Sequence, residues 1–360
     1  MLVQHFHPLV LSPFTLDDYL AQGWFRSSSS MYRARILCFE QALHEVINVR
    51  LNLKDYTPKK RLRRIKRKVH ERFEVIVRPF QNSAEKERLY QQHTHRFRGF
   101  LQKSLYHYLK GDDEERHHLS IFQTYEVCVF DKGQLIGFSL FDVGESAIAS
   151  IIGVFDINYE RYSIGTFTML QEIEYAQSLN FKYYYPGYVL HGTSIFDYKL
   201  RLGDMEFYDH NKEWRPISEL HTLERVSDLI TSKIDAAEKF IQAFDITCVK
   251  VNYPAFPFAY FDFDSIYYVR TPIFLLLFEK EIADNVLILE YWQEQDEYVI
   301  SQIDIHASFQ QIDRVKISKE ALNSSSNCLD LLAYSWIFAR EADLVSLFST
   351  FVEQLQHMEF

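Results

Sequence analysis

Cysteine is scarce in this sequence, and its spacing does not suit a metal site. The 360 residues include four cysteines, Cys38, Cys128, Cys248 and Cys328, which lie far apart in the chain. Structural zinc sites take cysteine and histidine ligands at short, regular spacings, and no such pattern is present. The last three cysteines lie in or beside apolar runs. We therefore expect reduced thiols with mostly structural roles, and no bound metal.

Long apolar runs are also missing. No run approaches the roughly 20 residues that a membrane-spanning helix requires, and the N-terminal segment 1–14 has no Lys or Arg before its short apolar part. Acidic residues outnumber basic ones by 49 to 39, which gives a formal net charge of −10. This balance argues against a uniformly basic surface but leaves room for a local basic patch. We expect a cytoplasmic protein without a membrane partner.

Apolar and aromatic residues, in contrast, are abundant. Hydrophobic residues make up 47% of the chain and aromatic residues 16%, so sizeable cores can form. A chain of this length exceeds one ordinary core and suggests two or three domains. We predict an N-terminal basic region over 1–80, a central domain over 81–240 and a β-rich domain over 241–360.

Basic residues are concentrated in one segment. Residues 59–68 read KKRLRRIKRK, with eight cations among ten residues. A charge run is often only a solvated helix or loop, but this density in an acidic protein also suits contacts with RNA phosphates. Both interpretations stay open. On the second, the candidate donor-binding residues are Arg63, Arg64, Arg67 and Lys68.

The stretch 149–203 predicts a strand, a tight turn, a helix and another strand. An apolar run ends near Phe155, the segment 163–166 leads into about four helical turns, and an aromatic strand begins at Phe181. The N–H groups that begin a helix attract an anion such as a phosphate, and a glycine allows close approach to the backbone. We predict that Ser163 caps this helix. The candidate donor-binding residues here are Arg161, Ser163, Gly165 and Thr166.

The segments before this stretch predict a strand over 69–79, a helix over 84–109 and a hairpin of two strands over 125–143. Strand, strand, strand, helix, strand, with a glycine turn before the helix, is the order of a GNAT-type N-acyltransferase core. We therefore predict an α+β fold with a GNAT-like acyltransferase core. In that fold a mixed sheet splays open, and the helix N-terminus holds the phosphates of an acyl donor.

The remaining segments carry weaker signals. Residues 206–235 are polar and are expected to connect helices, with a turn at 214–216. His117 and His118 lack a third ligand at suitable spacing, so we expect a solvated loop rather than a metal site. The aromatic C-terminal part predicts sheet core rather than base stacking. Its expected elements are strands over 273–278, 286–292 and 298–303 and an amphipathic helix over 335–358.

The central motifs resemble those of a known family. They are VFD at 154–156, YSIGTF at 162–167, LQEI at 170–173, YYYPGYVLHG at 183–192 and YK at 198–199. Together they closely resemble the C-terminal catalytic region of arginyl-tRNA–protein transferases, and segments from Asp18 to Arg78-Pro79 are similar in order to bacterial members. The resemblance implies a GNAT-like fold that moves an arginyl group from tRNA to the N-terminal amine of a protein. It implies aminoacyl-tRNA as co-substrate and no cofactor.

This chemistry implies candidate roles for polar residues near the motifs. The site must hold a neutral amine against an ester carbonyl, remove a proton and stabilise an oxyanion. His191 has the most suitable unperturbed pKa for proton transfer at neutral pH. Tyr198 and Lys199 could donate to the oxyanion or the tRNA end. Glu172 or Glu174 could hold the incoming ammonium, although a structural role suits each of these five positions equally well.

Two departures from the family stand out. Its N-terminal part usually carries a cysteine cluster, whereas only Cys38 is present here. After His191-Gly192 the family commonly reads Cys-Pro-Lys-Met-Arg, and here the segment 193–197 ends in Asp197 instead of arginine. An anion in that place predicts that acidic N-termini are poor acceptors. Arg201 could instead restore the cation or neutralise Asp197 through an i,i+4 pair.

Two other functions stay open at this point. The same helix N-terminus would accept the pyrophosphate of acyl-CoA, so the protein could be an acyl-CoA-dependent GNAT N-acyltransferase. It could also be a non-catalytic relative that binds RNA or a peptide. Transfer of an amino acid from tRNA to a protein or peptide N-terminus is the leading prediction.

Overall fold

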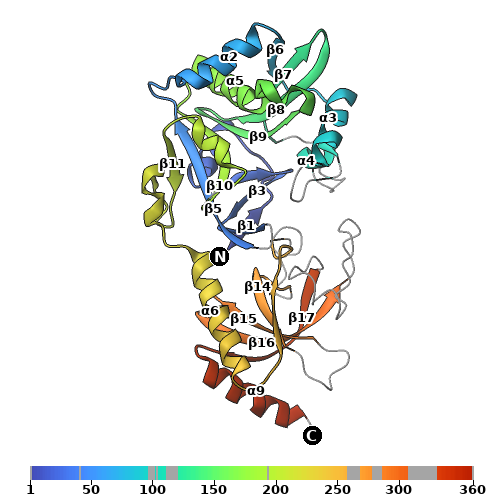
Figure 1. The fold of residues 1–360 in the computed structure, drawn as a ribbon, viewed down its shortest axis with the longest axis vertical. Coiled ribbons are helices and arrows are strands. Elements are labelled where there is room, and N and C mark those ends of the chain that lie inside the picture. Colours follow the sequence, from blue (N-terminus) through green and yellow to red (C-terminus); the bar gives the residue numbers. More distant parts are fainter. Residues whose placement is uncertain are drawn as a thin grey trace. The chain divides into compact units, whose positions relative to one another are not determined.

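The computed structural model describes residues 2–39, 42–95, 102, 104–110, 121–192, 194–257, 268–277, 286–306 and 331–358. The chain forms two compact units (Figure 1). We call residues 5–33 and 46–223 the core unit, and residues 1–4, 34–45 and 224–360 the β-rich unit. These units do not follow the boundaries at residues 80 and 240 expected from the sequence.

Eight strands of a nine-stranded mixed sheet form the frame of the core unit. Its strand order is β12-β11-β5-β10-β9-β8-β7-β6, and β4 pairs with β5 outside this path. The strands are β4 (Ile36–Phe39), β5 (Ala42–Asn52), β6 (Glu74–Pro79), β7 (Thr124–Asp131), β8 (Gln134–Val143), β9 (Ala147–Phe155), β10 (Tyr183–Leu190), β11 (Met205–Tyr208) and β12 (Trp214–Pro216). The predicted hairpin is confirmed, since Lys132 and Gly133 have φ values of 52° and 81°, the left-handed geometry that tight hairpin turns require.

The predicted strand-helix-strand stretch is confirmed as well. After β9 a 3₁₀ turn, η2 (Ile157–Tyr162), leads into α5 (Ile164–Ser178), and β10 returns parallel to β9. The two parallel strands pair only from Ala147↔Tyr183 to Ala149↔Tyr185. Beyond that register β10 has an irregularity ending at Gly187, whose φ is +93°, and it stays paired with β5 alone. The sheet therefore opens between the carboxyl halves of β9 and β10.

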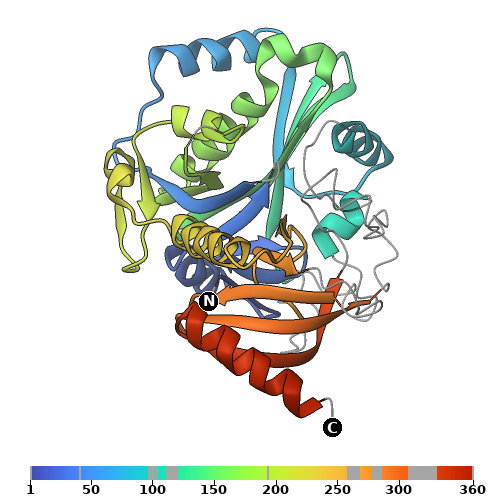
Figure 2. The same ribbon diagram turned by 60° about the horizontal axis from the view of Figure 1, so that its bottom comes forward.

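Helices cover both faces of this sheet (Figure 2). On one face, α5 and α2 (Lys60–His70) pack against strand residues such as Val127 and Phe141. On the other face, α3 (Ala84–Thr94) and α4 (Leu105–Lys110) pack against the alternate residues, such as Cys128 and Leu140. The alternation follows from the two-residue period of a strand, and each large apolar side chain so buried contributes about 1.5 to 3 kcal/mol. The α+β prediction is confirmed.

Short elements complete the core unit. Helix α1 (Pro13–Ala21) is capped by Ser12, whose hydroxyl accepts from the Thr15 N–H at 3.1 Å. Strands β1 (Val3–Phe6), β3 (Ser30–Ala34) and β2 (Phe25–Ser27) form a three-stranded sheet. Helix α1 and strand β2 are separated by Gly23, whose φ of +76° favours glycine.

Several element boundaries expected from the sequence are wrong. The segment 206–235 contains β11, β12 and a 3₁₀ turn, η4 (Ile217–Thr222), before α6 (Val226–Gln242) begins. Trp214–Pro216 is not a turn, because it pairs with β11 at the end of the sheet, where a proline costs no ladder hydrogen bond. The expected strand over 69–79 starts only at Glu74, since α2 continues to His70.

The expected helix over 84–109 is represented by α3 and α4, with most of the intervening residues outside the described ones.

The β-rich unit contains a five-stranded antiparallel meander. Its order is β13-β14-β15-β16-β17, and the three strands predicted from the sequence are confirmed. The strands are β13 (Cys248–Asn252), β14 (Ile273–Leu277), β15 (Val286–Trp292), β16 (Glu297–His306) and β17 (Leu331–Glu341). The predicted C-terminal helix starts late, as α9 (Leu344–Met358), because residues 331–341 pair with β16. Helices α6 and α9 meet through Phe240 and Phe348, with ring centroids 5.6 Å apart.

Candidate functional site

The open part of the sheet holds a lysine without a carboxylate partner. Lys199 lies in a 3₁₀ turn, η3 (Asp197–Arg201), and its Nζ donates to the Tyr188 carbonyl at 2.9 Å. The ammonium also lies 5.3 Å from the ring centroids of Tyr188 and Phe196. No carboxylate among the described residues pairs with it. Burial lowers the pKa of Lys199 to about 8, so a share of neutral amine exists near neutral pH.

Gly187 makes room for this lysine. A Cβ at this position would lie 3.3 Å from the Lys199 Nζ, and the φ of +93° would strain any other residue. The glycine of the YYYPGYVLHG motif therefore allows both the irregularity in β10 and the approach of the ammonium to the strand. Sequence reasoning assigned Lys199 but did not use this glycine.

Glu172 lies behind this region in the core. Its carboxyl is completely buried and accepts from the Tyr184 hydroxyl at 2.7 Å. Burial raises the pKa of Glu172 to about 7, and the hydroxyls of Ser139, Tyr184 and Ser150 partly offset the rise. Partial burial, and after it the charge of Glu172, raise the pKa of Tyr198, a residue that is still 40% exposed. This position does not favour direct contact between Glu172 and an acceptor ammonium.

The other predicted catalytic residues are more scattered. Glu174, on the outer side of α5, pairs with Lys66 at 2.6 Å and accepts from the Gln171 amide at 3.0 Å. His191 follows β10 and is half-buried, and no hydrogen bond joins it to any described residue. The structure therefore brings Glu172, Tyr184 and Tyr198 together, with Lys199 next to Tyr198 in the chain. The assignment of His191 to proton transfer stays a prediction.

The first turn of α5 differs in detail from the expected cap. Ser163 has a φ of +56°, and its side chain makes no capping hydrogen bond, so that prediction is wrong. The left-handed residue is Ser163 rather than Gly165, which has ordinary helical geometry. A Cβ on Gly165 would meet the Phe155 ring at 3.5 Å, an ordinary contact distance. Thr166 is half-buried in the same turn.

The basic run forms an amphipathic helix. Leu62, Ile65 and Val69 of α2 face the core, while Arg63, Arg64, Arg67 and Lys68 are exposed. Arg67 lies 3.6 Å from Glu71, but no ion pair involves Arg63 or Arg64 among the described residues.

Helix α2 runs antiparallel to α5. Lys66 pairs with Glu174, and four residues later the His70 ring lies 5.2 Å from that of Phe167. The carboxyl end of α2 therefore lies at the start of α5.

Three cations gather around one tyrosine at that end. The Tyr162 ring centroid lies 4.6 Å from the Lys68 Nζ, 5.0 Å from the Arg161 Cζ and 5.3 Å from the Arg72 Cζ. Lys68 also donates to the Arg161 carbonyl at 2.9 Å. Sequence reasoning included Lys68 and Arg161 but missed Arg72 and Tyr162. The only signal for these two was the continuation of the basic run and the tyrosine of the YSIGTF motif.

Asp197 is engaged locally. Its two carboxylate oxygens accept from the Ser194 N–H at 3.1 Å and from the Ser194 hydroxyl at 2.9 Å. No ion pair joins it to Arg201, although both residues belong to the described part of the chain. The expected i,i+4 pair is therefore wrong, because Ser194 already satisfies the Asp197 carboxylate.

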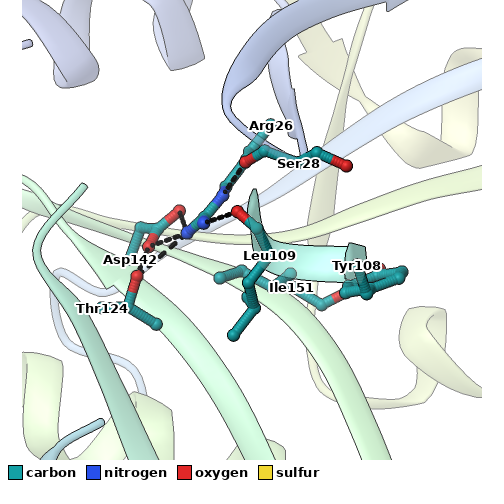
Figure 3. Close-up of polar contacts among 7 residues, drawn as sticks. All are labelled: Arg26, Ser28, Tyr108, Leu109, Thr124, Asp142 and Ile151. Carbon is teal, nitrogen blue, oxygen red and sulfur yellow. Dashed lines mark hydrogen bonds and ion pairs between the residues drawn. The ribbon is translucent and has the colours of Figure 1, made fainter. Parts of the chain in front are cut away.

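Arg26 ties the surrounding elements together (Figure 3). This 7% exposed guanidinium donates to Asp142 at 2.9 Å, to the Thr124 hydroxyl at 2.9 Å and to the Leu109 carbonyl at 2.7 Å. It thereby links β2 to β7, β8 and the end of α4. One residue before Leu109, the Tyr108 hydroxyl contacts the Ile151 carbonyl at 3.4 Å, in the part of β9 that no longer pairs with β10.

The cysteines fit their expected structural role. Burial raises the pKa of both Cys38 and Cys128 to about 12. Cys328 and the His117-His118 pair lie outside the described residues. Within the described ranges, no group of three or more His, Cys, Asp or Glu side chains is placed to hold a metal ion. The helices of those ranges include none with the length and apolarity needed to span a membrane.

The strand order, the opened sheet and the helix after β9 define the core unit as a GNAT-like acyltransferase fold. Within that class, residues 71–209 match the family described as "Arginine-tRNA-protein transferase, C terminus". This part of the chain is thus similar to that family, and the resemblance found in the sequence motifs is confirmed.

Curated relatives agree with this assignment. The aspartate/glutamate leucyltransferase of Stenotrophomonas maltophilia (strain K279a) is 35% identical over 81 residues, which cover 22% of this chain and 32% of that protein. The similarity thus spans about a third of that relative. The enzyme of the same name from Leptospira interrogans serovar copenhageni is 24% identical over 202 residues, 55% of this chain and 76% of that protein.

A eukaryotic relative and two solved structures extend the comparison. Arginyl-tRNA--protein transferase 1 of Saccharomyces cerevisiae is 30% identical over 76 residues, which cover 21% of this chain and 15% of that protein. The structure of L-PGS from Bacillus licheniformis is 15% identical, with a TM-score of 0.30 over 50% of this chain and 52% of that one. A structure of FemX is 10% identical, with a TM-score of 0.34 over 52% and 64%.

Proposed function

We propose that the protein is an aminoacyl-tRNA–protein transferase, which moves an amino acid from tRNA to the N-terminal amine of a protein or peptide. The match of residues 71–209 to the transferase family supports the reaction class. The observation that carries the proposal is the exposed basic face of α2, on which Arg63 and Arg64 make no ion pair among the described residues, and whose end lies at the start of α5. An acidic protein that concentrates free cations beside an acyltransferase core is suited to a polyanionic acyl donor.

The reaction requires a proton to leave the attacking amine. In our proposal, the neutral Lys199 amine takes this proton while the new C–N bond forms at the ester carbonyl. The C–O bond to the tRNA then breaks, and the proton passes to the departing ribose oxygen. Tyr198 is the candidate donor to the oxyanion, because its phenol is partly exposed beside Lys199. His191 remains the second candidate for the base.

The transferred amino acid is arginine in our proposal, by resemblance to the family. Leucine is the alternative, since several relatives are named as leucyltransferases. The test is to incubate the protein with tRNA charged with either amino acid and with an acceptor peptide, and to weigh the peptide by mass spectrometry. We expect the mass of one arginyl residue to be added. A protein that binds charged tRNA but modifies no peptide would be a non-catalytic relative.

The preferred first residue of the acceptor peptide is the second feature of the reaction to be assigned. The names of the relatives specify aspartate and glutamate, whereas the prediction from Asp197 is that peptides beginning with these residues are poor acceptors. A peptide set differing only in the first residue tests this with wild type, Asp197→Arg and Asp197→Asn. Efficient use of acidic peptides by the wild type would overturn the prediction. A gain that is specific to Asp197→Arg would support it, since Asp197→Asn removes the charge without adding a cation.

Acyl-CoA is the alternative donor. The three cations around Tyr162 would suit its pyrophosphate as well as an RNA phosphate. Mass spectrometry of small molecules released from the purified protein distinguishes the two, because copurifying CoA favours this alternative and copurifying RNA favours the proposal.

A further inference from the structure

The cations around Tyr162 are held together without an acid. The ring is buried, and cations favour the negative face of an aromatic ring, so the tyrosine can hold Lys68, Arg72 and Arg161 in place. Among the described residues, none of the three makes an ion pair with a carboxylate. A nearby acid, Asp131, accepts instead from the Tyr159 hydroxyl at 2.9 Å. The ring thus assembles positive charge without neutralising it.

This arrangement carries an electrostatic cost. Distances of 4.6 to 5.3 Å from one centroid mean that no two of the charges are more than about 10 Å apart. That separation is within about one Debye length at physiological salt, so their repulsion is only partly screened. An anion placed among them would turn the repulsion into attraction. Arginine and lysine side chains are the usual ligands of phosphate oxygens.

We propose that Lys68, Arg72 and Arg161 form a discrete phosphate site organised by the Tyr162 ring. This site is distinct from the exposed basic face of α2, where Arg61, Arg63 and Arg64 point to solvent. It rests on the proposed function, since the phosphate of an acyl donor is its expected occupant. A discrete site depends on particular side chains, whereas a basic face acts through its total charge.

The experiment compares two variants that lose the same charge. Arg72→Gln removes a member of the cluster, and Arg61→Gln removes an exposed cation from the same basic segment outside it. Affinity for uncharged tRNA is measured by filter binding across a salt series. We expect Arg72→Gln to weaken binding about tenfold more than Arg61→Gln at equal salt. Equal losses in the two variants would overturn the discrete site.

Tyr162→Leu gives a second test, because it changes no charge. We expect this variant to bind tRNA as weakly as Arg72→Gln does, provided that circular dichroism shows a native fold. Tyr162→Phe keeps the ring and should bind as wild type does. If Tyr162→Leu does not fold, the paired arginine variants still decide the question. Normal tRNA binding by a folded Tyr162→Leu would contradict the role of the ring.

A binding test with inorganic pyrophosphate shows whether the site accepts a free diphosphate or requires the phosphates of tRNA. A rise in melting temperature in wild type and Arg61→Gln, but not in Arg72→Gln, would support a site that also accepts a free diphosphate. No rise in any variant, together with a selective loss of tRNA binding in Arg72→Gln, would support a site that requires the polynucleotide. Failure of wild type to bind tRNA at all would instead contradict the proposed function.

Discussion

Aromatic rings contact cations in both compact units, but only some of these cations also pair with a carboxylate. In the β-rich unit, Lys233 lies 4.9 Å from the Tyr291 ring and pairs with Asp296 at 2.9 Å. Arg340 lies 4.7 Å from the Trp292 ring and pairs with Glu297 at 2.7 Å. The cluster around Tyr162 has rings but no carboxylates among the described residues.

The comparison distinguishes cationic side chains that stabilise the fold from those that remain available for a ligand. A cation that only stabilises a fold gains from a carboxylate as well as from a ring, as Arg26 does with Asp142 and Phe122. Among the described residues, no carboxylate pairs with Lys199 or with the three cations around Tyr162. Both places lie in the core unit, which also contains the family motifs. Replacing these cations should therefore affect the proposed reaction more than replacing cations that pair with a carboxylate.

The largest expected effect comes from Lys199→Met. Loss of the proton acceptor should lower the transfer rate between about a hundredfold and ten-thousandfold, the usual range for general base catalysis. Lys233→Met is the matched variant in the β-rich unit and should leave the rate unchanged. Steady-state kinetics with charged tRNA and peptide measure both. Equal rates in the two variants would contradict a role for Lys199 in proton transfer.

The pH profile sharpens this prediction. The lowered pKa of Lys199 means that the lysine is charged below about pH 8 and neutral above it. If its neutral amine is the base, the wild-type rate should rise with pH, reach half of its maximum near pH 8 and level off above that value. A profile without an inflection near pH 8 would contradict Lys199 as the base.

A second prediction concerns two buried acids, one in each unit. Glu172 in the core unit and Glu290 in the β-rich unit are both completely buried, and burial raises the pKa of each to about 7. Because the folded state holds each proton more tightly than the unfolded state, stability should fall as pH rises from about 4.5 to 7. The expected loss is on the order of 3 kcal/mol for each acid.

Urea titrations at pH 5 and pH 8 test this prediction. Glu172→Gln and Glu290→Gln should each remove part of the difference between the two pH values. The two acids also differ in their hydrogen-bond partners. Glu290 accepts from Thr271 and Tyr334, whereas Oε1 of Glu172 has no hydrogen-bond partner among the described residues. A glutamine should therefore be better tolerated at 172 than at 290.

A third, smaller effect is expected on tRNA affinity. Replacing Arg63, Arg64, Arg67 and Lys68 with Gln should weaken binding by more than about tenfold, since Lys68 also belongs to the cluster around Tyr162, and each lost contact should reduce the salt slope by roughly 0.7 to 0.9. The control replaces Lys233, Lys250 and Arg340, which pair with carboxylates in the β-rich unit. These changes should leave the slope unchanged. An unchanged slope in the α2 variant would show that its charge only solvates the helix.

Local signals account for what the sequence predicted correctly. The dipeptide Lys132-Gly133 is sufficient to predict the hairpin between β7 and β8. The apolar and glycine pattern around α5 likewise predicts strand, helix and strand without knowledge of other segments. Family motifs located the core because they lie within one continuous stretch. The resemblance also supplied Lys199, but its lowered pKa depends on burial that no sequence pattern records.

Contacts between distant segments account for what the sequence missed. Trp214 lies in a strand because it pairs with β11 and stacks with Arg50, more than 150 residues away. The β17 residues that were assigned to a helix are held by β16. The cluster around Tyr162 joins residues 68 and 72 to residue 161. Their proximity arises from the antiparallel packing of α2 on α5, which neither segment specifies alone.

The smallest expected effect comes from Gly165→Ala. The family motif places this glycine in the first turn of α5, but its backbone is helical and an added Cβ would contact Phe155 at an ordinary 3.5 Å. Alanine loses less conformational entropy than glycine in a helix, so the variant should be more stable than wild type by about 0.5 to 1 kcal/mol. Differential scanning calorimetry measures this gain. If a donor phosphate approaches the Gly165 backbone closely, the same methyl group should weaken tRNA binding while the protein becomes more stable. A variant that is stabilised and binds tRNA normally would assign this glycine to packing, and would leave the cations around Tyr162 as the proposed phosphate contacts at this end of the helix.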